Sequence, residues 1–475
     1  MNGQGEMLVV DQGSHASRAL QLAADGRVIG SGEAGVPARE PGPGRCEPDA
    51  EAIVDSVRRA VGEALAGRRP GDGVVAALAT QRSTIACWDR ETGEALAPVI
   101  SWRDRRNARW IESLAPDPGE VRRVTGLVPS PHYGASKLRW CLDHQPRVSG
   151  ARAAGRLCLG PLSSFLLFRL LEGRPFVVDP ANASRTLLWD VTTGEWSPRM
   201  LDLFGIPADC LPRCVPSRHA FGALRLGGGE IPLRVCTGDQ AAALFARGEP
   251  RRDTAYVNIG TGGFVQRPFD APAGPVDGLL ESVAWRDGDD TLRVLEGTVN
   301  GAGAAVTWLA GDLGIPETSL VEAAAAWMAE ASNPPLFVNG VGGLGAPWWV
   351  PDCPVRFEGE GGPAEKTVAV LESIAFLLRA NLEAMDAAAG PVTRLVVTGG
   401  LSRLDGLCAR LASLAGVPAE RPAETEATAA GLAFLLSGRS RGEGGSPDVF
   451  EPRPDPALAG RYARWREAME TAIRG

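Results

Sequence analysis

The chain has 475 residues, of which 44% are hydrophobic and 22% are charged, and it carries a formal net charge of −8 at pH 7. At roughly 100–200 residues per domain, this length predicts two or three globular domains. The negative net charge argues against a general nucleic-acid binder and against a protein of anionic membrane surfaces.

Cysteine usage and hydropathy indicate the compartment. The nine cysteines include no CxxC pair, which argues against a zinc ribbon and a thioredoxin-like site. Scattered thiols are typical of a reducing compartment. Because no apolar run is long enough to span a bilayer and the first residues do not resemble a signal peptide, we expect a cytoplasmic protein without a membrane or nucleic-acid partner.

Strand and helix signals alternate along the first half of the chain. Short apolar runs predict buried strands, and turn residues between apolar stretches predict hairpins. One segment has Ile53, Val57 and Val61 on one helical face, and Gly67 suits its end. The predicted elements are a strand over 6–11, a hairpin over 20–33, a helix over 48–67, a strand over 73–81 and a hairpin over 85–102.

The second half continues the same alternation. It ends in a polar, Gly- and Pro-rich stretch over 439–456, which predicts a flexible connection to one amphipathic helix over 457–475. The elements expected before it are a hairpin over 253–267, a helix over 300–314, a helix over 365–390, a strand, double-glycine turn and helix over 393–416, and a helix over 425–438.

Both halves open in a similar way. A predicted strand runs into a short pattern of Asp or Asn, any residue, Gly, and Ser or Thr, and a second strand then returns. This pattern begins at Asp11 and again at Asn258. This pattern indicates either a duplicated domain or two unrelated hairpins.

The glycine turns are candidate phosphate loops. The chain has no GxxxxGK[ST] motif, and no GxGxxG motif opens a helix after the first strand. Bound ATP would therefore be held by hairpin loops whose backbone N–H groups face phosphate oxygens. Gly13 with Ser14, and Gly260 with Thr261 and Gly262, suit that role, since glycine permits close approach. The alternative is that both are ordinary turns.

Two carboxylates strengthen the interpretation as an enzyme. Asp11 and Asp239 each end an apolar strand, and acids at strand ends lie in the crevice where open α/β sheets bind ligands. Phosphoryl transfer requires Mg²⁺ and a base for the hydroxyl proton. Asp239 alone could equally cap a helix that begins at Gln240. The pair predicts a common groove that holds a metal and a triphosphate.

The motifs resemble those of the FGGY family of sugar and polyol kinases, and within it most closely the glycerol kinases. The resemblance runs from about residue 7 to about residue 436. The matching segments are DQGSHASRALQLAADG, TQRSTIACWDRETGEALAPVISWRDRRN, SKLRWCLDH, TGDQAAALF, NIGTGGF, LEGTVNGAGAAVTWL, GVGGLGAPWW, VTGGLSRLDGL and ERPAETEATAAGLAFL.

The resemblance implies an α/β fold of two actin/hexokinase-like, ribonuclease-H-like domains, with an ATP and substrate cleft between them. The domains would cover 1–247 and 248–438, followed by a linker and helix over 439–475. The implied reaction is the ATP- and Mg²⁺-dependent phosphorylation of a hydroxyl of a small polyol or sugar, with glycerol to glycerol 3-phosphate as the first candidate. Association into homodimers or homotetramers is also implied.

The resemblance also implies roles for single residues. Asp239 would be the general base, and Asp11 and Asp239 would hold the metal. The nucleotide would be bound by Asp11, Gly13, Ser14, Arg18, Gly260, Thr261, Gly262, Gly303, Gly399 and Gly400. The substrate would be bound by Arg82, Ser83, Trp102, His132, Asp239 and Gln240.

Three positions depart from the glycerol-kinase pattern. Ser83 stands where those kinases have Glu, His132 where they have Tyr, and His15 where the first loop has a hydroxyl residue. These changes leave open another polyol or a ketose such as xylulose as the substrate. They also leave open a catalytically impaired sensor, and an actin-like or chaperone-like ATPase is the third alternative.

Overall fold

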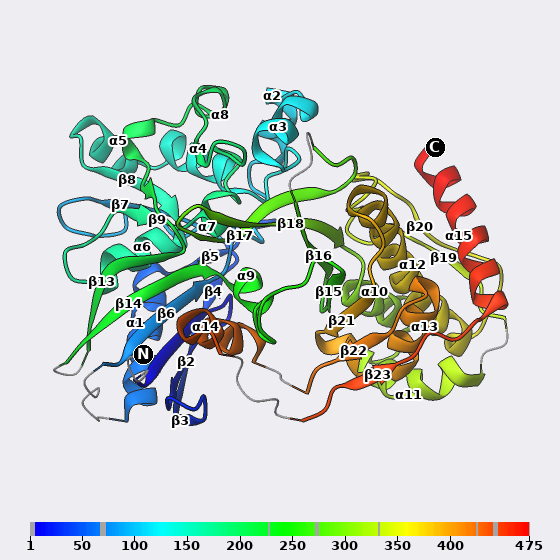
Figure 1. Cartoon of the computed structure of the whole chain (residues 1–475). Coiled ribbons are helices and arrows are strands. Elements are labelled where there is room, and N and C mark those ends of the chain that lie inside the picture. Colours follow the sequence, from blue (N-terminus) through cyan, green and yellow to red (C-terminus); the bar gives the residue numbers. More distant parts are fainter. Residues whose placement is uncertain are drawn as a thin grey trace. The chain divides into compact units, whose positions relative to one another are not determined.

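The structure is a computed structural model that describes residues 5–66, 73–226, 229–270, 275–330, 333–423, 426–439 and 445–474. The chain forms two compact units (Figure 1). Unit 1 contains Met1–Pro250, Glu281–Arg293 and Glu426–Glu443, and unit 2 contains Arg251–Leu280, Val294–Thr425 and Gly444–Gly475. Each unit is thus assembled from separate stretches of the chain. The predicted linear division into 1–247, 248–438 and 439–475 stays a prediction.

The main sheet of unit 1 brings three parallel strand ends to one level. Its order is β13 (Arg218–Leu226), β14 (Gly229–Gly238), β6 (Val75–Thr80), β1 (Met7–Gln12), β2 (Ala16–Leu22) and β3 (Val28–Gly35). The strands β14, β6 and β1 run parallel. Gln12 of β1 and Gly238 of β14 both lie opposite Thr80 of β6. This register places Asp11 and Asp239 at the same edge of the sheet.

Helices cover both faces of this sheet. The helix α1 (Ala50–Leu65) begins at Asp49, whose side chain accepts a hydrogen bond from the N–H of Ala52. Because side chains alternate along a strand, Leu8 and Val10 pack into the cluster that contains the apolar face of α1. Val9 and Asp11 instead line a cavity with Ala429 of α14 (Ala427–Ser437).

The rest of unit 1 consists of short elements. Its helices are α2 (Ala108–Leu114), α3 (Pro118–Thr125), α4 (Gly134–His144), α5 (Pro146–Ala153), α6 (Leu162–Leu170), α7 (Pro180–Ala183), α8 (Pro198–Phe204) and α9 (Asp239–Ala243). Its strand pairs are β4 (Ala38–Arg39) with β5 (Glu47–Pro48), β7 (Ile85–Asp89) with β8 (Leu157–Pro161), β12 (Arg213–Cys214) with β9 (Val177–Val178), and β10 (Trp189–Asp190) with β11 (Glu195–Trp196).

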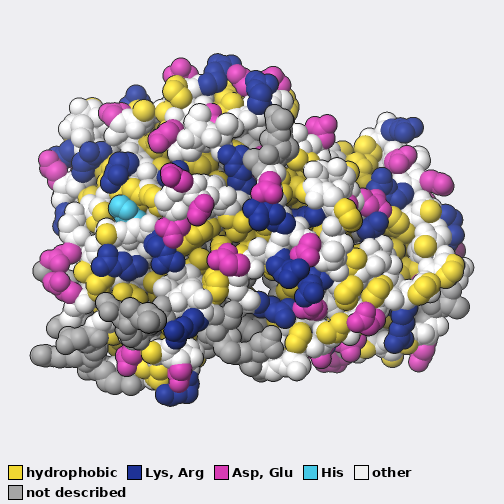
Figure 2. All heavy atoms as spheres, in the orientation of Figure 1, with side chains coloured by type: hydrophobic (Ala, Val, Ile, Leu, Met, Phe, Trp, Pro, Cys, Tyr) yellow, Lys and Arg dark blue, Asp and Glu magenta, His cyan; other side chains and the backbone are white. Residues whose placement is uncertain are grey.

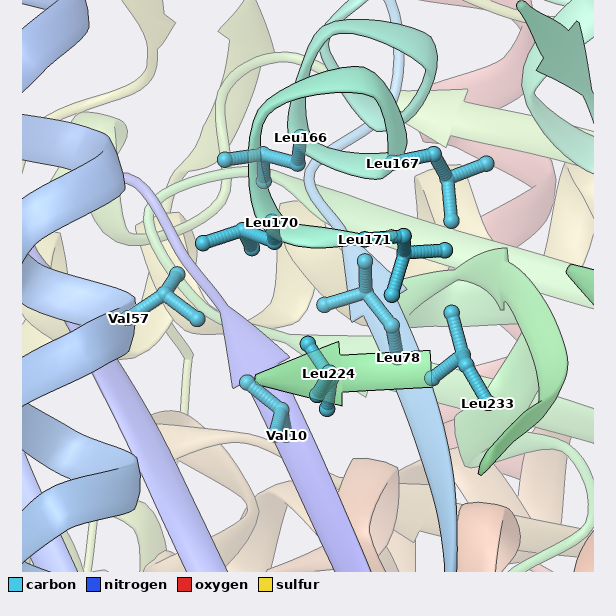
Figure 3. Close-up of a pocket in the computed structure, with 9 residues that line it drawn as sticks. All are labelled: Val10, Val57, Leu78, Leu166, Leu167, Leu170, Leu171, Leu224 and Leu233. Atoms are coloured by element: carbon cyan, nitrogen blue, oxygen red, sulfur yellow. The ribbon is translucent and has the colours of Figure 1, made fainter. Parts of the chain in front are cut away.

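The core between α1, α6 and the sheet contains a small apolar cavity (Figure 3). Val10, Val57 and Leu78 line it together with leucines of α6, and its volume is only about 10 Å³. This is at the lower limit for one water molecule, and the wall offers no polar partner. The cavity is therefore a packing defect and not a ligand site.

A second sheet, most of it in unit 2, has the order β17-β18-β16-β15-β21-β22-β23. The strands are β17 (Leu280–Asp287), β18 (Asp290–Val299), β16 (Gly263–Phe269), β15 (Thr254–Ile259), β21 (Arg394–Thr398), β22 (Ala419–Arg421) and β23 (Asp448–Phe450). The helices of unit 2 are α10 (Gly303–Leu313), α11 (Glu317–Glu330), α12 (Pro363–Ala389), α13 (Asp405–Ala415) and α15 (Pro456–Arg474), and β19 (Leu336–Asn339) pairs with β20 (Val355–Glu358).

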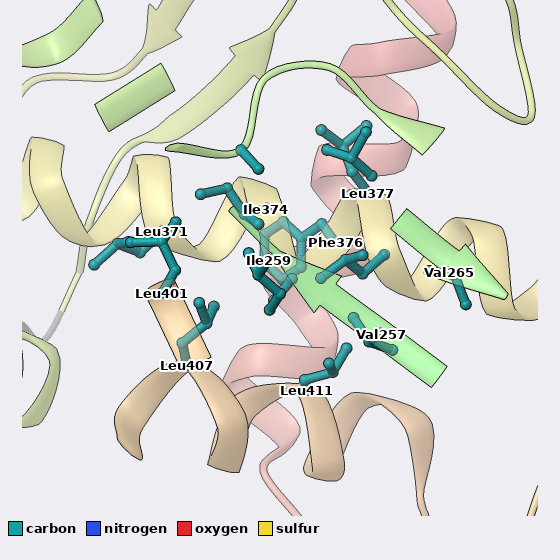
Figure 4. Packing of buried hydrophobic residues seen from close by; sticks show 14 of the residues in the cluster. Val257, Ile259, Val265, Leu371, Ile374, Phe376, Leu377, Leu401, Leu407 and Leu411 are labelled. Atoms are coloured by element: carbon teal, nitrogen blue, oxygen red, sulfur yellow. The ribbon is translucent and has the colours of Figure 1, made fainter. Parts of the chain in front are cut away.

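The long helix α12 forms the centre of the unit 2 core (Figure 4). Leu371 and Ile374 of this helix belong to one buried cluster with Val257 and Ile259 of β15. Leu407 of α13 is fully buried in the same cluster. The helix is thus enclosed by apolar side chains along most of its length, which explains why the run from Val368 to Leu378 is mostly apolar.

The terminal helix α15 docks on its own unit. Trp465 is fully buried and donates a hydrogen bond from Nε1 to the carbonyl of Phe337 at 2.9 Å. Arg461 pairs with the buried carboxylate of Glu372, which also binds Arg410 at 3.1 Å. The helix is therefore an integral part of unit 2.

Most of the predicted elements are confirmed, including the two hairpins with glycine turns, the long helix and the terminal helix. The predicted helix stop at Gly67 lies outside the described residues. For the hairpin over 85–102, the prediction of a second strand is wrong. β7 pairs with β8 instead, and the returning chain makes isolated bridges at Ala95 and Ile100. Pro98 lies between these bridges and has no N–H for a ladder.

The polar stretch over 439–456 also differs from expectation. Residues 440–444 lie outside the described residues, but Asp448–Phe450 form β23 and pair with β22. The prediction of a flexible connection is therefore wrong for this part. None of the described helices is long and apolar enough to cross a membrane. On the face shown in Figure 2, acidic and basic side chains are interspersed.

Candidate functional site

The two predicted carboxylates are neighbours in unit 1. The pKa of Asp11 is raised to about 7, mainly by burial and to a smaller extent by the charge of Asp239. One carboxylate oxygen of Asp11, Oδ1, is buried and has no hydrogen-bond partner among the described residues. Two acids that act on each other in this way need a proton or a cation between them. The pairing predicted from the strand ends is therefore present within one unit.

Asp239 follows β14 and is the first residue of α9. Gly238 is the N-cap, so the alternative of Asp239 as a cap is wrong. The Oδ1 of Asp239 accepts a hydrogen bond from the N–H of Gln240 at 2.7 Å. Burial raises the pKa of Asp239, and the positive charges of Arg82 and Arg185 oppose that effect. A half-buried carboxylate with a raised pKa, whose charged form is favoured by neighbouring cations, suits a base.

Arg82 is fixed over the start of α9. Its guanidinium donates a hydrogen bond to Oε1 of Gln240. Its side chain also packs on Gly238, where a Cβ would lie 2.6 Å from both Cγ and Cδ of Arg82. A glycine is thus required beneath Arg82, and this glycine places the arginine next to Asp239.

The turn after β1 is tied to a residue predicted in the substrate site. The N–H of Gly13 bonds to the carbonyl of Ala16 at 2.9 Å and closes the turn. Trp102 donates from Nε1 to the hydroxyl of Ser14 at 2.8 Å. His15 is exposed at the tip. The first candidate phosphate loop and Trp102 therefore form one structure.

Arg18 lies opposite Asp11 in the register of β1 and β2. Its side chain pairs with Glu33 at 3.0 Å and with Glu426 at 3.9 Å. These residues also line the cavity of about 470 Å³ beside Asp11. Arg18 is therefore bound to carboxylates in this structure, and binding a phosphate would require it to exchange partners.

An aromatic and polar cluster of side chains lies around Trp102. The ring of His132 meets that of Trp102 at 5.8 Å between centroids and that of Tyr133 at 5.0 Å. His132 is half-buried. Ser83 is 4% exposed, has a φ of +61° and has a buried hydroxyl without a hydrogen-bond partner in the described chain. Strain and an unsatisfied polar atom at one residue are typical of a binding site.

Lys137 supports this cluster and was not among the site residues expected from the sequence. Its ammonium donates to the carbonyls of Ser83 at 2.9 Å and His132 at 2.5 Å. Burial is the main cause that lowers its pKa. The segment SKLRWCLDH, which resembles the FGGY family, contains this lysine, so the sequence held a signal for it. The contact with Ser83 could not be predicted, because it depends on a loop 54 positions earlier in the chain.

The glycine residues predicted for the nucleotide meet in unit 2. The hairpin turn between β15 and β16 contains Gly260, Thr261 and Gly262. The N–H of Gly303 bonds to the carbonyl of Gly260 at 2.9 Å, and a Cβ on Gly303 would lie 2.8 Å from that oxygen. The start of α10 is thus packed against the hairpin turn.

Gly399 joins the same group from β21. Its φ is +92°, and a Cβ would lie 2.6 Å from the carbonyl oxygen of Ile259. Only glycine fits both the backbone conformation and the close approach. Gly400 follows as the first residue of a short 3₁₀ helix. The predicted glycines of unit 2 therefore form one cluster at the end of β15.

The described residues contain no group of three or more metal-ligating side chains. Mg²⁺ often uses only one or two carboxylates, and it fills the remaining positions with water and phosphate oxygens. Asp11 with its unpartnered Oδ1, beside the charge of Asp239, fits that smaller donor set.

Comparisons with known proteins identify the family. The N-terminal and C-terminal domains of the FGGY family of carbohydrate kinases match residues 6–246 and 255–437. A protein named glycerol kinase from Alkalilimnicola ehrlichii is 37% identical over 98% of each chain. Another of that name, from Geobacter sp. strain M21, is 38% identical over 90% of this chain and 89% of its own.

Solved structures agree on the fold. The Plasmodium falciparum glycerol kinase with ADP has a TM-score of 0.87 and 23% identity, covering 99% of this chain and 98% of its own. A xylulose kinase from Brucella ovis has a TM-score of 0.83 and 22% identity, with 98% of both chains covered. These matches confirm the predicted two-domain α/β fold class. The chain belongs to the FGGY family of carbohydrate kinases.

Proposed function

We propose that the chain transfers the γ-phosphoryl group of ATP to a hydroxyl of a small polyhydroxy compound, in the manner of a glycerol kinase. The observation that carries this proposal is the half-buried carboxylate of Asp239, which lies beside Asp11 and Arg82. Relatives named glycerol kinase that span nearly the whole chain support it. Glycerol is the first acceptor to test, and a ketose such as xylulose the second.

Asp239 is the general base of the proposed reaction. It accepts the hydroxyl proton while the hydroxyl oxygen attacks the γ-phosphorus. Burial raises the pKa of this carboxylate and makes it more basic, whereas the charge of Arg82 favours its ionised form. The acceptor is oriented by Arg82, Gln240 and Trp102. Arg82 and Gln240 are fixed by the hydrogen bond between them, and Trp102 is fixed by its bond to Ser14.

Asp11 and Asp239 are the proposed ligands of Mg²⁺, which when bound neutralises charge on the phosphates. Gly13 and Ser14 in unit 1 are proposed to contact the phosphates, and Arg18 joins them after leaving its carboxylate partners. In unit 2 the proposed nucleotide contacts are Gly260, Thr261, Gly262, Gly303, Gly399 and Gly400.

The cellular setting is also a proposal. The described cysteines are all free thiols, and most are buried. Free buried thiols are typical of a reducing compartment, which supports a cytoplasmic location. Association into a homodimer or homotetramer follows from the family resemblance alone.

The test is the substitution Asp239→Asn. We expect turnover, followed as ADP release, to fall by about a thousandfold because the variant has no proton acceptor. The melting temperature and nucleotide binding should remain close to those of the native chain. Asp55→Asn, on the exposed face of α1, is the matched control. Turnover of Asp239→Asn at the native rate would refute the proposal.

A further inference from the structure

The helix α14 packs against the elements that present both acids of the proposed site (Figure 1). It contacts β1, which contains Asp11, and the neighbouring strand β6. At Gly431 it approaches α9, the helix that begins with Asp239, so closely that a Cβ would lie 1.8 Å from the carbonyl oxygen of Ala242. All of these elements belong to unit 1. This packing fixes the position of α14 beside both carboxylates.

Two residues at the start of α14 act on Asp11. Burial is the largest effect on the pKa of Asp11 and raises it, and the negative charge of Glu426 acts in the same direction. A hydrogen bond with the side chain of Thr428 lowers this pKa. A bond that lowers the pKa of a carboxyl group favours its charged form, which only accepts hydrogen bonds. The hydroxyl of Thr428 is therefore the donor.

The two carboxylate oxygens of Asp11 differ in their surroundings. Oδ1 is buried and has no hydrogen-bond partner among the described residues, so we assign the bond from Thr428 to the other oxygen, Oδ2. A carboxylate that is tethered through one oxygen cannot rotate freely about its last bond. The bond from Thr428 thus fixes the direction of Oδ1, which the described part of the chain leaves unsatisfied.

The unsatisfied oxygen calls for a cation. A buried carboxylate oxygen without a partner is costly, and the charge of Asp239 further disfavours the ionised form of Asp11. A divalent cation that binds Oδ1 relieves both effects. In metal sites, side chains that orient a metal ligand typically change metal affinity by about 10–100-fold when they are removed. A donor that orients Asp11 should therefore matter for metal binding.

We propose that Thr428 is a positioning residue, whose hydroxyl holds Oδ2 of Asp11 and thereby directs Oδ1 toward the metal ion. This inference rests on the proposed function, and it gives α14 a part in metal binding. Thr428 acts through Asp11 and does not itself bind the metal. Because the hydroxyl is the active group and the methyl is not, serine can replace threonine at this position and valine cannot.

The experiment measures Mn²⁺ binding to the full chain in the presence of ADP, with the electron paramagnetic resonance signal of the free ion as the readout. Thr428→Val has nearly the native shape but no hydroxyl, and it should weaken Mn²⁺ binding by about tenfold or more. Thr428→Ser retains the hydroxyl and should bind Mn²⁺ almost as tightly as the native chain. Binding of ADP without metal should be the same in all of these proteins.

Three further proteins complete the comparison. Ser437→Ala, at the other end of α14, is the matched control and should bind Mn²⁺ as the native chain does. Thr428→Ala also lacks the hydroxyl and should show the same loss as Thr428→Val. Since alanine favours a helix, the test does not depend on the folding of the valine variant. In an Asp11→Asn background, Thr428→Val should cause no further loss, because the tether acts only through Asp11.

The outcomes separate this inference from the proposed function. If Thr428→Val and Thr428→Ala bind Mn²⁺ like the native chain, or if Thr428→Ser loses as much affinity as Thr428→Val, the positioning role is refuted. If Asp11→Asn weakens binding in the same experiment, the metal assignment still stands. If Asp11→Asn binds Mn²⁺ like the native chain, the metal assignment of the proposed function fails, and the role of Thr428 fails with it.

Discussion

Arg82 packs against Gly238 in the space that a side chain at that position would fill. We expect Gly238→Ala to raise KM for the acceptor by about tenfold or more, because its Cβ would fall 2.6 Å from Cγ and Cδ of Arg82 and displace the bond to Gln240. The φ of Gly238 is −80°, which alanine adopts without strain, so the melting temperature should change little. Gly62→Ala, on the exposed side of α1 with no atom within 4 Å of its Cβ, is the control. An unchanged KM in Gly238→Ala would contradict this account.

Asp179 makes the stability of unit 1 depend on pH. Burial raises the pKa of this carboxyl from 3.8 to about 6. Since the folded chain holds the proton more tightly than the unfolded chain, the stability contribution of Asp179 is complete below pH 3.8 and is lost as the pH rises through about 6.

Asp179→Asn removes this charge and retains an oxygen acceptor for the N–H of Asn182. We expect the variant to be more stable than the native chain at pH 8, by at most about 3 kcal/mol, and to lose that advantage near pH 4. Melting curves at the two pH values measure the difference. Asp117→Asn, at the exposed cap of α3, is the control. A difference that does not vary with pH would rule out this role of Asp179.

Single residues also mark the limit of what the sequence predicts. Asp11 and Asp239 were predictable because each ends an apolar strand, and strand ends meet at one edge of a sheet. The pairing of Arg18 with Glu33 and Glu426 could not be predicted. It depends on a strand register and on a helix hundreds of positions later in the chain, and local patterns do not encode either.

At the scale of elements, α15 is held by one large side chain. Trp465 stacks against Tyr462 and lies 5.4 Å from the ring of Phe376. We expect Trp465→Ala to destabilise unit 2 by about 3–5 kcal/mol, because it leaves a cavity and the unpaired carbonyl of Phe337. Thermal unfolding measures the loss. Arg474→Ala, whose side chain is exposed, should leave the melting temperature unchanged. A native melting temperature for Trp465→Ala would show that α15 contributes little.

Elements with long, regular patterns were predicted well, and short edge pairings were not. The apolar spacing of α1 and α12 identifies them without tertiary information. The partner of β7 is β8, which lies about seventy residues later in the chain and is invisible to a search for nearby turns. β23 was not predicted because it has only three residues and lies in a stretch that is polar and rich in glycine and proline.

At the scale of the whole molecule, unit 1 depends on segments from the second half of the chain. The hydroxyl of Thr237 donates to the carbonyl of Ala284 at 3.2 Å. Gly431 of α14 lies so close to α9 that a Cβ would be 1.8 Å from the carbonyl oxygen of Ala242. A division at residue 247 would remove both partners.

We therefore expect a fragment of residues 1–247 to lack a cooperative thermal transition, and we expect the intact chain to show one. Circular dichroism melts of the fragment and of the full chain make the comparison. A fragment that melts sharply at the temperature of the full chain would show that the linear boundary suffices.

The same interleaving sets an order for biosynthesis. Domains at the start of a chain commonly fold while the remainder is still being translated. Here the strand and helix that complete unit 1 come from Glu281–Arg293 and Glu426–Glu443. The N-terminal part of unit 1 therefore stays incompletely folded until nearly the entire polypeptide has left the ribosome. Truncated products of interrupted translation will therefore expose the face of its central sheet on which α14 packs.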